Sequence, residues 1–61
     1  MAKQGEEERE EIRRLMAEGS FDRKTNIYLN RLLAIDEAFD EIGVDGGEIR
    51  NLAKGLVLEQ I

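Results

Sequence analysis

Apolar residues recur at helical spacing in two stretches of the chain. The first stretch has intervals of four and three residues and contains Tyr28, Leu32, Ile35, Phe39 and Ile42. This spacing predicts a helix from about residue 30 to residue 42. The second stretch has a similar periodicity and contains Ile49, Leu52, Ala53, Leu56 and Val57. It predicts another helix from about residue 46 to residue 59.

The segment between these helices has the composition of a tight turn. Gly43 suits the left-handed conformation that ends many helices, and Val44 can supply the apolar contact of a Schellman motif. Asp45, followed three residues later by Glu48, resembles a capping box at the start of the next helix. We therefore expect two helices that are joined by a short turn.

Residues 6–18 predict a further helix, in which glutamates come first and arginines later, an order that suits the helix dipole. Its apolar stripe is thin and consists of Ile12, Leu15 and Met16, so we expect it to pack weakly. We interpret residues 1–20 as an acidic N-terminal helical extension of a domain formed by residues 21–61. The extension is either a docking segment for a protein partner or a solvated tail, and we favour the tail.

Residues 23–29 admit two interpretations. In a strand, Thr25, Ile27 and Leu29 would share one face, and the residues between them would share the other. In a helix, Tyr28 would extend the apolar row of the following helix backwards. We expect the strand, because threonine, isoleucine and tyrosine are good strand formers.

A strand, a helix, a tight turn and a second helix within residues 23–60 resemble the ribbon-helix-helix family of DNA-binding proteins. The stretch from Lys24 to Leu29 is similar to the strand of that family, and residues 30–42 are similar to its first helix. The stretch from Asp45 to Arg50 is similar to the start of its second helix. The resemblance implies a mainly α homodimer whose two strands pair and enter the major groove of duplex DNA. It also implies a transcriptional regulator, a repressor that occupies a short palindromic site.

The resemblance also implies which residues bind DNA and which form the dimer core. Outward-facing strand residues would read base edges, and glycines at the start of the second helix would hold a phosphate. With the basic side chains near the strand included, the DNA-binding residues would be Arg23, Lys24, Asn26, Tyr28, Arg31, Gly46 and Gly47. The shared apolar core of the dimer would be formed by Ile27, Leu29, Leu32, Ile35, Phe39, Ile42, Ile49, Leu52 and Leu56.

The charge of the chain restricts any contact with DNA to a local patch. The net charge is −5, which disfavours general attraction to nucleic acid or to a membrane surface. Residues 20–34 are the exception, because Arg23, Lys24 and Arg31 outnumber Asp22. This segment contains the expected strand.

The composition limits the other possible functions. A chain of 61 residues forms one domain and is marginally stable as a monomer. It has no cysteine or histidine, which removes disulfides and the commonest metal ligands, so we expect oligomerisation to stabilise it, without a metal or cofactor. We expect no enzyme, because so small a chain rarely encloses a substrate cavity. The N-terminus lacks the apolar core of a signal peptide, and no apolar run approaches the roughly 20 residues of a membrane span, so we expect a cytoplasmic protein.

A competing interpretation is an all-α protein that does not bind DNA. In it, residues 22–42 form one long helix that pairs with residues 46–60 as a helical hairpin, or within an oligomeric three-helix module. Such a protein would act as an adaptor that binds other proteins. The two interpretations differ in whether Thr25, Ile27 and Leu29 pair with a symmetry mate.

Overall fold

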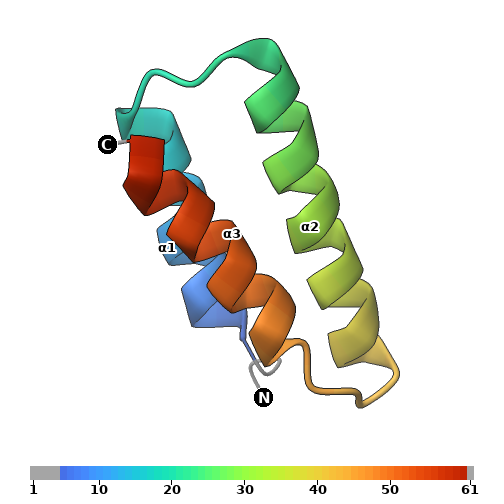
Figure 1. Ribbon diagram of the computed structural model, residues 1–61. Helices are drawn as coiled ribbons and strands as arrows, with labels where there is room; N and C mark the ends of the chain where they lie inside the picture. Colours follow the sequence, from blue (N-terminus) through green and yellow to red (C-terminus); the bar gives the residue numbers. More distant parts are fainter. Residues whose placement is uncertain (1–4, 61) are drawn as a thin grey trace.

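The computed structural model describes residues 5–60 and shows three α-helices. They are α1 (Glu6–Glu18), α2 (Arg23–Glu41) and α3 (Gly47–Gln60). The chain runs up through α1, down through α2 and up again through α3, so that α2 and α3 are antiparallel (Figure 1). The bundle measures 32 × 18 × 15 Å. The all-α alternative therefore describes the fold, while residues 1–4 of the expected extension and residue 61 lie outside the described part.

The prediction of a strand at residues 23–29 is wrong, because these residues form the first two turns of α2. The Asp22 carboxylate caps the helix by accepting a hydrogen bond from the Thr25 backbone N–H at 3.3 Å. Ile27 is 42% exposed whereas Leu29 is fully buried, so the two residues do not share the face that a strand would give them. Residues 5–60 contain no strand, which contradicts the resemblance to the ribbon-helix-helix family.

All three helices contribute to one small core. The helix predicted at residues 6–18 is confirmed, and it buries Ile12 against the other two helices. The fully or nearly buried apolar residues are Ile12, Leu29, Leu32, Leu33, Ala53 and Val57. The partly buried residues packed around them are Leu15, Met16, Phe21, Ile49 and Leu56.

The predicted turn between α2 and α3 is confirmed in its hydrogen bonds. Gly43 has a positive φ of 77°. The Val44 N–H donates to the Phe39 carbonyl at 2.8 Å and the Gly43 N–H donates to the Asp40 carbonyl at 3.2 Å, which is the Schellman pattern. The Asp45 carboxylate then accepts a hydrogen bond from the Gly47 N–H at 3.0 Å, at the start of α3. This bond goes to the residue two positions on, and not to Glu48 as in the expected capping box.

We expect Gly43→Ala to lower the free energy of unfolding by about 1 kcal/mol, as measured by urea denaturation. A methyl group at this position would meet no atom within 4 Å, so the loss reflects only the left-handed backbone. Gly43→Asn is the matched control, because asparagine tolerates this conformation better than alanine does. An equal or larger loss for asparagine would contradict the conformational explanation.

Candidate functional site

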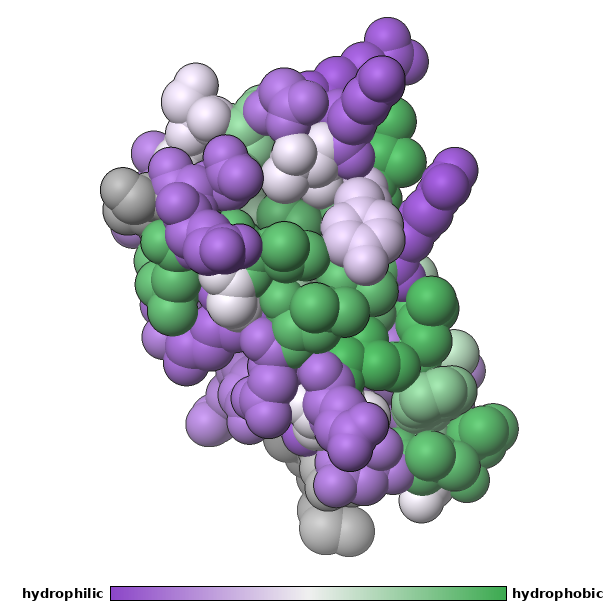
Figure 2. All heavy atoms as spheres, viewed as in Figure 1, coloured by the Kyte–Doolittle hydropathy of each residue, from purple (hydrophilic) through white to green (hydrophobic). Residues whose placement is uncertain are grey.

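The outer surface of the bundle carries more large apolar side chains than its core does. Among the described residues, seven are exposed, namely Ile27, Tyr28, Ile35, Ile42, Val44, Leu52 and Leu58. Figure 2 shows apolar side chains gathered in a continuous patch across the side of the molecule formed by α2 and α3. Large exposed apolar patches that are bordered by polar residues are typical of protein–protein contact sites.

One row of this surface runs along α2. Tyr28, Ile35 and Ile42 are spaced by seven residues, which is close to two helical turns, so they lie on one line. They are 48%, 44% and 72% exposed, respectively. The row comes one position before the buried residues Leu29 and Asp36 and is therefore turned by about 100° from the core.

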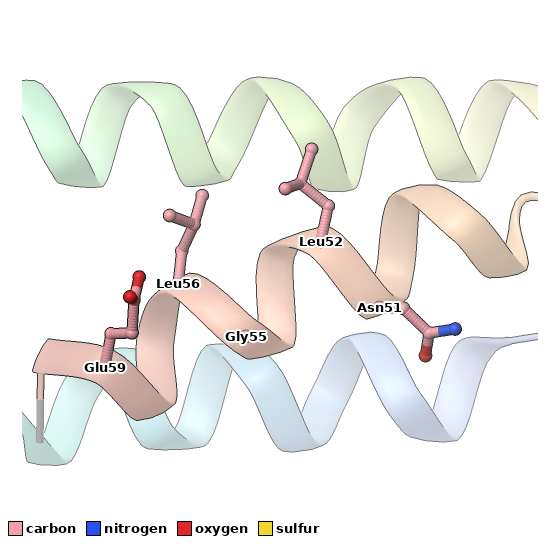
Figure 3. Close-up of a pocket in the computed structure, with 5 residues that line it drawn as sticks. All are labelled: Asn51, Leu52, Gly55, Leu56 and Glu59. Atoms are coloured by element: carbon pink, nitrogen blue, oxygen red, sulfur yellow. The ribbon is translucent and has the colours of Figure 1, made fainter.

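The matching row on α3 is formed by Leu52 and Leu56, which come one position before the buried Ala53 and Val57. In both helices the outer row is thus turned by the same angle and in the same sense from the buried row. Because α2 and α3 are antiparallel, this turn brings both rows to the same side of the helix pair. In Figure 3, Leu52 and Leu56 point toward α2.

An open hollow lies on α3 between these side chains. Its volume is ≈ 380 Å³, and it is lined by Asn51, Leu52, Gly55, Leu56 and Glu59. Gly55 contributes only backbone to this lining and is labelled on the ribbon of α3 in Figure 3. A methyl group added at Gly55 would meet no atom within 4 Å, so the packing of the single chain does not require glycine here. We define the α2–α3 face as Tyr28, Ile35 and Ile42 of α2 together with Leu52, Gly55 and Leu56 of α3.

Charged residues of opposite sign border the two halves of the α2–α3 face. Lys24 and Arg31 alternate with Tyr28 and Ile35 along α2 at intervals of four, three and four residues. Glu48 and Glu59 flank Leu52 and Gly55 on α3 at the same intervals. All four charged side chains are exposed. The α2 half is therefore basic and the α3 half is acidic.

A second candidate is a cluster of buried charges near the C-terminal end of α2, where the three helices meet. Asp36 is fully buried and accepts hydrogen bonds from Arg9 of α1 at 2.6 Å and from Arg50 of α3 at 2.8 Å. The buried Asp40 carboxylate lies 2.8 Å from the Arg9 guanidinium. Arg50 also reaches Glu8 at 3.2 Å and Asp45 at 3.5 Å.

The two arginines of this cluster remain charged at any pH at which proteins are ordinarily studied. Burial lowers the pKa of Arg9, but its hydrogen bonds and charge interactions with Asp36 and Asp40 outweigh burial, so the net pKa is raised. Burial likewise lowers the pKa of Arg50, and the charges and hydrogen bonds of Asp36 and Glu8 raise it above its usual value. The cluster fixes the three helices relative to one another. Its four buried charges, those of Arg9, Asp36, Asp40 and Arg50, face each other rather than solvent, so we assign the cluster a structural role.

The residues expected to bind DNA do not form a single reading surface. Arg23, Lys24, Tyr28 and Arg31 are exposed on the first half of α2. Asn26 is partly buried, and its amide donates a hydrogen bond to the Phe21 carbonyl at 3.4 Å. Because the segment is helical, the paired strands that were expected to carry Lys24, Asn26 and Tyr28 into the major groove are absent from the described residues.

The two glycines expected to hold a phosphate lie among carboxylates. Gly46 is buried against Asp36, and the Gly47 N–H donates to the Asp45 carboxylate. Two negative charges at this helix start disfavour a phosphate.

The expected dimer core is divided between the inside and the outside of one chain. Leu29 and Leu32 are in its buried core, and Phe39, Ile49 and Leu56 are partly buried. Exposed members are Ile27, Ile35, Ile42 and Leu52. The ribbon required Ile27 to pair with a strand of another subunit. This expectation is wrong, because Ile27 is helical.

Comparison with protein-family models, with curated proteins and with solved structures gives no match. Within residues 5–60, no helix combines the length and apolar character needed to cross a membrane. The same part of the chain brings no three acidic residues together in a way that could hold a metal ion. The arrangement of the chain's own side chains is therefore the basis for its functional interpretation.

Proposed function

We propose that this protein is a helical protein–protein interaction module that binds through the α2–α3 face. The observation that supports the proposal is that the α2–α3 face contains four of the seven large apolar side chains that the described part of the chain leaves exposed, namely Tyr28, Ile35, Ile42 and Leu52. Covering them with another protein surface would remove apolar area from water at about 25 cal/mol per Å². A chain of this size has few other sources of stability.

The helical form of residues 23–29 supports this function over DNA binding through a ribbon. The basic residues Lys24 and Arg31 alternate with the apolar Tyr28 and Ile35 on the same line of α2. In a protein interface such charges form the polar rim around an apolar centre. Lys24 and Arg31 therefore serve as rim residues in the proposed module.

Site-specific photocrosslinking in living cells tests the module. A photoreactive phenylalanine analogue at Leu52, which is 50% exposed at the centre of the α2–α3 face, should give protein adducts after irradiation. The same analogue at Arg13, which is exposed on α1, is the matched control and should give few adducts. Equal, background-level labelling from both positions would argue against an interaction function.

A further inference from the structure

We infer that the partner on the α2–α3 face is a second copy of this chain, with α2 of each copy packed over α3 of the other. This inference rests on the proposed interaction function and specifies the occupant of the same face. A twofold axis parallel to the helices generates the arrangement, because it exchanges the α2 and α3 halves while each copy keeps its level along the bundle. Such an isologous contact requires that one face contain both members of every complementary pair.

The shapes of the two halves meet this requirement. The α2 half carries protruding side chains, above all Tyr28 and Ile35, whereas the α3 half has a hollow of ≈ 380 Å³ over Gly55. Packing within the single chain does not require glycine at position 55, because a Cβ atom there would have no neighbour within 4 Å. Glycine inside a helix lowers helix stability. The close approach of a side chain from another molecule would explain why glycine occupies this position. Tyr28 of the partner subunit would fill the hollow.

The level of the residues along the bundle supports this pairing. Asp36 of α2 lies against Gly46 and Arg50, so it is level with about residue 48 at the start of α3. Both helices rise by the same distance per residue in opposite directions. Counting eight residues back from Asp36 and eight forward from residue 48 places Tyr28 level with Leu56, next to Gly55. The same count places Lys24 level with Glu59 and Gln60.

The charges around the face agree with self-association. The partner's Lys24 would lie beside Glu59, and the symmetric pair would form at the other edge of the interface. Lys24 and Arg31 balance Glu48 and Glu59, so the face is locally neutral although the chain carries a net charge of −5. A basic partner would find no net attraction there. A dimer with α2 over α2 would instead place the bases of both copies together.

A dimer would need to cover only a modest share of the surface of this chain. A standard interface covers about 800 Å² of each partner, which is roughly a fifth of the 4415 Å² surface of this chain. The row on α2 extends along most of that helix, and the row on α3 occupies its middle, so the apolar side chains would lie at the centre of such an interface. Dimerisation would also add to the small core of the single chain.

Sedimentation equilibrium of the full chain from about 1 μM to about 1 mM tests the inference first. We expect the mass to rise from 7.0 kDa toward twice that value. Gly55→Gln should weaken the dimer at least tenfold, because it fills the hollow. Glutamine is a better helix former than glycine, so the thermal stability of the dilute monomer should stay equal or increase. This second measurement separates a blocked interface from a damaged fold.

Charge reversal then tests the pairing of α2 with α3. Lys24→Glu or Glu59→Lys alone should each weaken the dimer roughly tenfold, because each creates a like-charged pair at both edges. The double variant, and an equimolar mixture of the two single variants, should recover association, because each again pairs opposite charges. Glu10→Lys on α1 is the control for net charge and should not weaken the dimer.

A monomer at every concentration would overturn the inference, and so would a dimer that is insensitive to Gly55→Gln and to both charge reversals. These failures differ from a failure of the interaction function itself. If the chain is monomeric but Leu52 crosslinks to a different protein, the module stands and only the second copy is wrong as its occupant. If Leu52 forms no adducts and the chain is monomeric, both are wrong.

Discussion

Asp36→Asn is expected to lower the free energy of unfolding by about 3 kcal/mol, because it removes the negative charge that two buried arginines share. The Asp36 carboxylate is fully buried and lies 2.6 Å from Arg9 and 2.8 Å from Arg50. Asparagine keeps the size of the side chain but leaves both guanidinium groups with less compensation in a region without solvent. Thermal and urea unfolding followed by circular dichroism would measure the loss. For a domain of this length it is a large share of a total stability of roughly 3–9 kcal/mol.

Asp45→Asn is the matched control for this experiment. It is the same chemical change and also acts on Arg50, but Asp45 is 71% exposed and its distance to Arg50 is 3.5 Å. Asparagine can still cap the start of α3, so the expected loss is below about 0.5 kcal/mol. Similar losses for the two variants would contradict the view that burial makes Asp36 decisive.

The cluster explains how α1 belongs to the bundle although its apolar stripe is thin. Arg9 is buried beside Ile12 on the same side of α1, and it contacts Asp36 and Asp40 of α2. Ile12, Leu15 and Met16 are the only apolar residues on the stripe of α1, and these three alone predict a weakly attached extension. The apolar pattern of the sequence does not include Arg9, although this charged residue occupies a core position.

A signal for the cluster was nevertheless present in the sequence. Asp36 and Asp40 continue the helical row of Leu29, Leu32 and Leu33 toward the end of α2. Acidic residues on the buried side of a helix need partners, and buried charges are usually paired. The sequence does not identify the arginines that pair with these acids, because Arg9 and Arg50 are 27 and 14 residues away from Asp36. Only the three-dimensional arrangement brings them together.

Local patterns were reliable where only one structure satisfied them. The Schellman turn at Gly43 and the helices on either side of it followed from spacing and glycine chemistry. Residues 23–29 fit both a strand pattern and a helix pattern, and their residue preferences favour the strand. Preferences of this kind depend on context. The helix is favoured instead because Asp22 caps its start and because Leu29 is buried. Leu29 begins a buried row that continues along the same helix through Leu33 and Asp36.

The division of the apolar residues into an inner and an outer set could not be predicted from periodicity alone. Ile35 and Leu32 belong to the same 4-3-4-3 row in the sequence, yet Leu32 is in the core and Ile35 is 44% exposed. The width of the apolar stripe on α2 exceeds what one neighbouring helix covers. The position of α1, which packs mainly beside α3, decides which edge of the stripe stays exposed (Figure 1).

Gly46→Ala is the second change with a large expected effect, a loss of about 3 kcal/mol in the free energy of unfolding. A methyl group at Gly46 would collide with the Asp36 carboxylate and push it away from Arg50. Gly46 does not have a positive φ, so the loss would come from this collision rather than from backbone strain. Gly47→Ala is the matched control, since its methyl group would approach the exposed Asp45 side chain at 3.3 Å and the Arg50 guanidinium only at an ordinary contact distance of 3.7 Å. Urea unfolding of both variants should show a loss only for Gly46→Ala; equal stabilities would mean that Asp36 is not held in place and that the buried cluster does not fix the start of α3.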